Sequence, residues 1–118
     1  MLATPDMRIP VRFFPPATAG ADSAWLIEGD APAPGSGPVA RFRLPTARIG
    51  HPVGCACCAP RGPVAEALSR LFLARARGEV AFFRDVLALP HDAAGAAAIR
   101  AALAQDSLLA GRFRLVAD

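Results

Sequence analysis

The stretch DVLALPHDAAGAAAIRAALAQ, residues 85–105, decides the fold class. It begins with a short apolar run that Pro90 ends, which is typical of a buried strand. Asp92 is a preferred N-cap residue, and the alanine-rich segment Ala93–Gln105 behind it predicts a helix. A buried strand followed directly by a helix is the building unit of parallel α/β sheets.

A second helix is predicted before this strand, over Pro63–Arg77. Pro63 suits the first helical position because its missing N–H would have no partner there, and Gly78 supplies the C-cap. Glu66 precedes Arg70 by one turn, which predicts an ion pair on the helix surface. The apolar side chains recur at helical spacing on one face: Val64, Leu68, Leu71 and Phe72.

Four further strands complete the expected sheet: residues 9–14, 25–27, 39–44 and 112–116. Pro10 is expected to confine the first strand to a sheet edge or to shorten it, because proline cannot donate a ladder hydrogen bond. A short turn over Ser107–Ala110, broken by Gly111, leads into the last strand. This order predicts one α/β domain over residues 1–118, with a small, mostly parallel sheet, flanking helices and a Pro/Gly-rich loop at 29–38.

The composition argues against several classes of protein. The chain is 53% hydrophobic and 19% charged, which does not fit a disordered protein. Its formal charge is +3, but the basic residues, all arginines, are scattered and lack the dense stripe that nucleic-acid binding requires. No apolar run approaches the ~18 residues of a membrane span, and the N-terminus lacks the pattern of a secretory signal. We therefore expect a cytoplasmic protein that binds neither nucleic acid nor membrane.

The three cysteines of the chain, Cys55, Cys57 and Cys58, lie within four positions. An odd number cannot form a paired disulfide framework, and closely spaced thiolates are soft ligands that favour Zn(II), Cu(I) or iron–sulfur species over Mg or Ca. A tetrahedral zinc site needs a fourth ligand, for which His51 is the nearest candidate. The cysteine loop, residues 54–62, is therefore predicted to bind zinc.

Other interpretations of this loop stay open. The fourth ligand could instead be water, His91, Glu66 or a cysteine from a second chain. The thiols could also be small buried apolar side chains, as free cysteines often are. Cys55 and Cys58 have the C-x-x-C spacing of thioredoxin-like redox sites, although Cys57 interrupts that motif.

The cysteine loop resembles that of the CobW family of P-loop GTPases and metal chaperones. The similarity rests on GCACCAPRG at 54–62, continues through residues 68–71 and 76–79, and returns in LLAGRFRL at 108–115. The resemblance implies a reduced P-loop-GTPase-like architecture and a metal site formed by the three cysteines. In that family, GTP binding and hydrolysis drive metal delivery.

The chain departs from this family at the nucleotide site. A P-loop needs a lysine that reaches the phosphates, and the family recognises guanine through N-K-x-D, but the chain contains neither Lys nor Asn. Residues 18–23 stand where the P-loop is expected and keep only Gly20 and Ser23 of its pattern, while Asp22 would repel phosphate. Neither nucleotide binding nor nucleotide hydrolysis is therefore expected.

Two functions are consistent with these features, and in neither is the chain an enzyme. The first is a zinc-binding, CobW-like protein that buffers or delivers the metal without hydrolysing nucleotide. The alternative is a pseudo-GTPase that serves as a protein-interaction module through its apolar helix face and the pairs Phe13-Phe14 and Phe82-Phe83. Core packing is the simpler explanation of these pairs. A homodimer that shares a metal between two cysteine loops would combine both functions.

Overall fold

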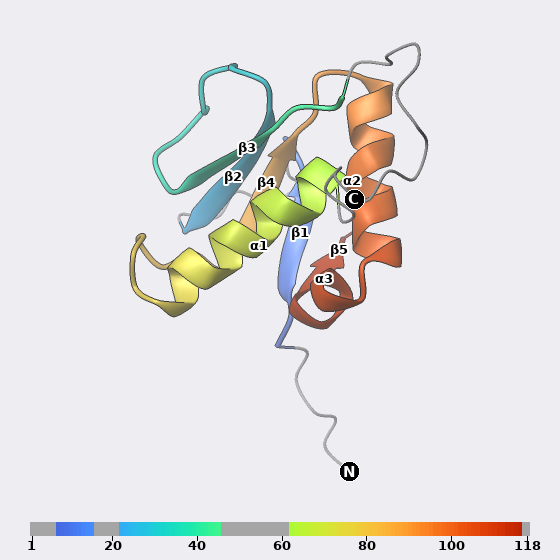
Figure 1. The fold of residues 1–118 in the computed structure, drawn as a ribbon. Coiled ribbons are helices and arrows are strands. Elements are labelled where there is room, and N and C mark those ends of the chain that lie inside the picture. Colours follow the sequence, from blue (N-terminus) through green and yellow to red (C-terminus); the bar gives the residue numbers. More distant parts are fainter. Residues whose placement is uncertain (1–6, 16–21, 46–61, 117–118) are drawn as a thin grey trace.

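A five-stranded parallel sheet with three helices forms the molecule in a computed structural model, which describes residues 7–15, 22–45 and 62–116 (Figure 1). The strands are β1 Ile9–Phe13, β2 Ser23–Glu28, β3 Val39–Phe42, β4 Asp85–Leu89 and β5 Phe113–Leu115. The helices are α1 Gly62–Ala76, α2 Ala93–Gln105 and α3 Ser107–Arg112. Every strand pair is parallel, so the predicted α/β class with a parallel sheet and flanking helices is confirmed.

Capping residues fix the ends of the helices. Asp92 caps α2, since its carboxylate accepts a hydrogen bond from the N–H of Gly95 at 3.1 Å. Asp106 caps α3 in the same way, accepting from the N–H groups of Leu108 and Leu109. Gly111 was expected to break this turn, but α3 continues through it. Nothing lies within 4 Å of its Cβ position, so Gly111 is accommodated as an exposed helical residue.

Of the two effects expected of Pro10, confinement of β1 to an edge or shortening of the strand, the first is wrong. The strand order is β3-β2-β4-β1-β5, which places β1 between β4 and β5. The carbonyl of Val11 accepts from the N–H of Val116 at 2.9 Å, so the polar groups of Val11 face β5 and those of Pro10 face β4. The first partner pair of β1 and β4 joins Val11 to Val86. Pro10 precedes that ladder, and its missing N–H therefore interrupts no hydrogen bond.

All three helices cover the same face of the sheet (Figure 1). Helix α1 contacts β3, α2 and α3, while α2 and α3 both contact β5. The core between the helices and this face holds most of the fully buried large side chains: Val11, Leu26, Leu68, Phe83, Val86, Ile99, Leu109 and Phe113. Side chains alternate along β3, because Phe42 is buried on this face while Val39 and Arg41 are exposed.

A loop covers the opposite face. Trp25, Ile27 and Leu87 form a second, smaller apolar cluster there, and Ala33 of the β2–β3 connection packs against it. The indole Nε1 of Trp25 donates to the carbonyl of Ser36 at 3.3 Å. Residues 29–38 contain neither helix nor strand, as predicted, and fold back over the sheet that they leave. No helix in the described parts of the chain is long and apolar enough to cross a membrane.

Candidate functional site

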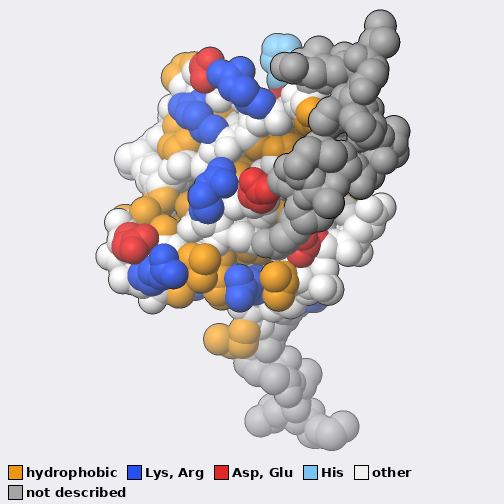
Figure 2. Space-filling view, viewed as in Figure 1, with side chains coloured by type: hydrophobic (Ala, Val, Ile, Leu, Met, Phe, Trp, Pro, Cys, Tyr) orange, Lys and Arg blue, Asp and Glu red, His pale blue; other side chains and the backbone are white. Residues whose placement is uncertain are grey.

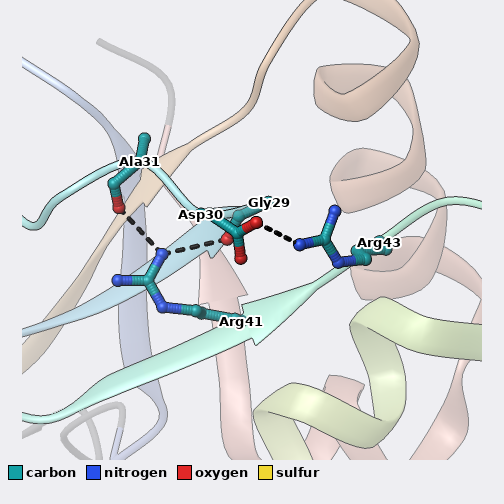
Figure 3. Close-up of polar contacts among 5 residues, drawn as sticks. All are labelled: Gly29, Asp30, Ala31, Arg41 and Arg43. Carbon is teal, nitrogen blue, oxygen red and sulfur yellow. Dashed lines mark hydrogen bonds and ion pairs between the residues drawn. The ribbon is translucent and has the colours of Figure 1, made fainter.

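The carboxyl ends of β2 and β3 carry a group of charged residues. In parallel α/β sheets this edge is where ligands usually bind. Nη1 of Arg41 donates to the carbonyls of Gly29 and Ala31 at 2.9 and 2.8 Å, and Nη2 of Arg43 lies 2.5 Å from Oδ2 of Asp30 (Figure 3). The carbonyls orient Arg41 without neutralising its charge, whereas Asp30 neutralises Arg43.

These residues line a cleft of about 360 Å³, called here the arginine cleft. Its wall consists of Gly29, Asp30, Arg41, Phe42, Arg43, Pro63, Glu66 and Arg70. Three arginines against two carboxylates leave one excess positive charge, so the cleft favours a negatively charged group. The expected ion pair between Glu66 and Arg70 is not present in the described parts of the chain.

A larger cleft of about 660 Å³, called here the anchor cleft, lies where α1, α2 and α3 meet. Leu44, just after β3, and Gly62, the first residue of α1, both line it. Residues 46–61 belong to the connection between β3 and α1. The described residues near its two ends, Leu44 and Gly62, line the same cleft. This connection contains the three cysteines and His51.

The predicted zinc ligands lie outside the described residues. These are His51, Cys55, Cys57 and Cys58, and of the predicted cysteine loop only Gly62 is described. Within the described ranges, no three His, Cys, Asp or Glu side chains come together in a way that could hold a metal ion.

Of the alternative fourth ligands, Glu66 and His91 are described residues. Glu66 is half-buried on α1, where it lines the arginine cleft. His91 is exposed after β4, and its backbone N–H donates to Oε1 of Glu28 at 2.8 Å. His91 lies in the short connection between β4 and α2.

The contact between Glu28 and α2 was not predicted from the sequence. The Glu28 carboxylate lies at the N-terminus of α2, where the helix dipole favours negative charge. A Cβ at position 95 would overlap with Oε1 of Glu28, so this close approach requires Gly95. Nothing in the local sequence connects residues so far apart in the chain. The only signal was a glycine inside an alanine-rich helix, which suggests a close approach without naming the partner.

Ser23 does not occupy a P-loop position. It is the first residue of β2, and its hydroxyl donates to Oδ1 of Asp85 at 2.5 Å, while Oδ2 of Asp85 accepts from Arg12 at 3.0 Å. In a P-loop the corresponding hydroxyl holds Mg²⁺. The Ser23 hydroxyl instead donates to Asp85 of the neighbouring strand. Gly20 lies outside the described residues, and Asp22 forms an exposed ion pair with Arg84 at 3.5 Å.

The length of the β1–β2 connection also differs from a P-loop followed by a helix. Only residues 14–22 separate the two strands. A parallel crossover that includes a helix takes at least about 10–12 residues.

Each of the two phenylalanine pairs is divided between core and surface. Phe83 is fully buried, whereas Phe82 is 61% exposed. Phe13 packs against the main core, and Phe14 is exposed with its ring centroid 5.6 Å from that of Trp25. The guanidinium of Arg75 lies 4.4 Å from the ring centroid of Phe82. Core packing thus accounts for one member of each pair.

Fold and site together define an α/β protein with a parallel sheet and a charged carboxyl edge. Comparisons of the chain with models of protein families, with curated proteins and with solved structures find no match. The resemblance to the CobW family therefore stays a hypothesis that rests on the sequence motifs quoted above.

Proposed function

We propose that this protein binds one zinc ion through Cys55, Cys57, Cys58 and His51, and that it buffers or delivers the metal without hydrolysing nucleotide. Three thiolates and an imidazole form a donor set that zinc prefers in tetrahedral sites. The proposal rests on the sequence of the cysteine loop and is supported by what surrounds the two ends of that loop.

The first support is position. The connection that carries the four ligands leaves the fold after β3 and re-enters at α1, and both of its ends line the anchor cleft. It therefore departs from the carboxyl edge of a parallel sheet, the usual place of ligand sites in this class of fold.

The second support is charge. A zinc ion held by three thiolates and one neutral imidazole has a net charge of −1, because three negative ligands exceed the two positive charges of the metal. The arginine cleft carries one excess positive charge, and Pro63, which lines it, also lines the anchor cleft. An arginine close to a cysteine would also favour its thiolate form, which is the form that binds metal.

Metal content tests this proposal. The full chain would be purified under reducing conditions, loaded with zinc, separated from excess metal and measured by elemental mass spectrometry. We expect about one zinc per chain, lost in Cys57→Ser and reduced in His51→Ala. His91→Ala is the matched control, since His91 is the other histidine of the chain and lies exposed after β4. It should retain the full amount of zinc.

Two further readouts distinguish how the metal is held. Cobalt(II) in place of zinc should give a sulfur-to-cobalt charge-transfer band that weakens in each cysteine variant. Half a zinc per chain, together with a dimer in sedimentation, would assign the site to two copies of the chain. An absence of metal after reconstitution would overturn the proposal. Added GTP should be neither hydrolysed nor bound.

A further inference from the structure

The outer edge of β3 offers hydrogen-bonding groups that point away from the sheet. The carbonyls of Pro38 and Phe42 accept from Trp25 and Gly29 on the β2 side, at 2.8 and 2.9 Å. Because polar groups alternate along a strand, the N–H and C=O groups of Val39 and Arg41 face outward. No other described strand pairs with this edge, since β3 ends the strand order.

A groove runs beside this edge, between β3 and α1. It has a volume of about 480 Å³ and is called here the edge groove. Its apolar lining includes Leu71 and Ala74 of α1 and Val80 just beyond that helix. A strand added next to β3 would direct every second side chain toward this lining, because side chains alternate between the two faces of a sheet.

The charged residues of the edge groove are both positive. Arg41 and Arg70 line it and no carboxylate does. Arg41 binds two neutral carbonyls through Nη1 alone, and Arg70 forms no ion pair in the described parts of the chain. Figure 2 shows basic side chains over the region of β3 and α1. The groove is therefore complementary to an acidic partner.

We propose that the edge groove binds an extended acidic peptide segment of a partner protein, which adds a parallel or antiparallel strand to β3. Its backbone pairs with Val39 and Arg41, its apolar side chains contact Leu71, Ala74 and Val80 on the helix side of the sheet, and its carboxylates lie beside Arg41 on the other side, with Arg70 adding positive charge to the groove. A second copy of this chain is the less suitable occupant, since pairing β3 with itself brings Arg41 and Arg70 of both copies together.

Fluorescence anisotropy with two labelled hexapeptides tests the proposal. One is (Glu-Val)₃ and the other is (Lys-Val)₃, each titrated with the full chain. We expect binding of the acidic peptide alone. Arg70→Glu should weaken it by about tenfold or more, because a like charge then faces the peptide. Arg77→Glu, an exposed change of the same charge outside the groove, is the matched control and should stay within about twofold.

A second pair of variants tests the strand pairing itself. Val39→Pro removes an outward N–H at the first residue of an edge strand, where proline is tolerated, and should abolish binding. Val39→Thr keeps the N–H and the β-branched shape and should bind normally. In hydrogen exchange, the acidic peptide should slow the amides of Val39 and Arg41.

Circular dichroism verifies that each variant is folded before binding is compared. Failure of the wild type to bind (Glu-Val)₃, equal binding of the lysine peptide, or unchanged binding by Arg70→Glu would overturn the proposal. A dimer in sedimentation that Val39→Pro dissociates would also overturn it, by assigning the edge to a second copy.

Discussion

The two faces of the sheet are covered in different ways. Three helices pack on one face and bury the main core, while residues 29–38 cover the other face with a loop. Parallel sheets are normally protected by helices on both faces. Here the loop face depends on Trp25, whose ring lies against Phe14 and whose indole N–H donates to the carbonyl of Ser36, while Ala33 packs against the cluster that Trp25 forms with Ile27 and Leu87. A short connection without regular structure can therefore protect a parallel sheet when a large aromatic side chain lies beneath it.

The sharpest test of this difference compares two neighbours on β2. Leu26 faces the helices and Ile27 faces the loop, and both are fully buried. Leu26→Ala should cost about 4 kcal/mol of unfolding free energy, because rigid helices leave a cavity open. Ile27→Ala should cost about 2–3 kcal/mol, since the loop can move inward and reduce the cavity. Urea unfolding of the two variants measures the difference. An equal or larger cost for Ile27→Ala would show that the loop is as rigid as the helices.

A change in the loop itself should have a smaller effect that is confined to one face. Gly37 has a φ of +126°, and a Cβ there would overlap with the carbonyl oxygen of Ser23. Gly37→Ala should cost about 2 kcal/mol or more. Trp25 is the only tryptophan, so its fluorescence should shift to the red as the loop lifts away. Gly29→Ala, also at positive φ but in open space, is the control and should leave the emission unchanged.

The polar group on the loop face should contribute less than the apolar cores. Asp85 accepts from both Ser23 and Arg12, and its side chain is 14% exposed. Asp85→Ala leaves both donors without their acceptor and should cost about 2 kcal/mol in thermal or urea unfolding. A cost near zero would mean that water accepts the hydrogen bonds of Ser23 and Arg12 in place of the carboxylate. The polar group would then be more accessible to solvent than the 14% exposure of Asp85 indicates.

The smallest effect is expected at the sheet edge. The ion pair between Asp30 and Arg43 is solvent-exposed, with side-chain exposures of 80% and 68%. Asp30→Ala should change stability by no more than about 0.5 kcal/mol, because water screens exposed pairs. It should nevertheless increase the positive charge of the arginine cleft. Urea unfolding at low and high salt measures the change in stability and its electrostatic part. A loss above 1 kcal/mol would contradict the prediction.

Local signals predicted the helices better than the sheet. The N-cap Asp92 and the stop at Pro90 set the bounds of α2 and β4, and both match the structure. Position in the sheet was harder to predict, because a strand's neighbours depend on contacts far along the chain. Pro10 shows this clearly, since a proline costs a hydrogen bond only on the side its N–H would face.

The arginine cleft and the cysteine loop also differ in how far local sequence predicts them. The arginine cleft brings together residues that follow β2 with residues of β3 and α1, and no local motif marks it. Thiol spacing, in contrast, predicts metal ligands without any knowledge of the fold, so the sequence alone makes the cysteine loop a candidate site. The exposed Phe82 and buried Phe83 share one sequence signal, and only the packing of the core separates them.

The contact between Glu28 and Gly95 has a consequence for evolution. A mutation that gives position 95 a side chain would push the Glu28 carboxylate away from the backbone N–H of His91, just before α2. The clashing atoms belong to the end of the flexible Glu28 side chain, which can move aside, and a shorter residue at position 28 would remove the clash altogether. In homologous sequences we expect these two positions to vary as a pair, so that their covariation links β2 to α2 without any structure.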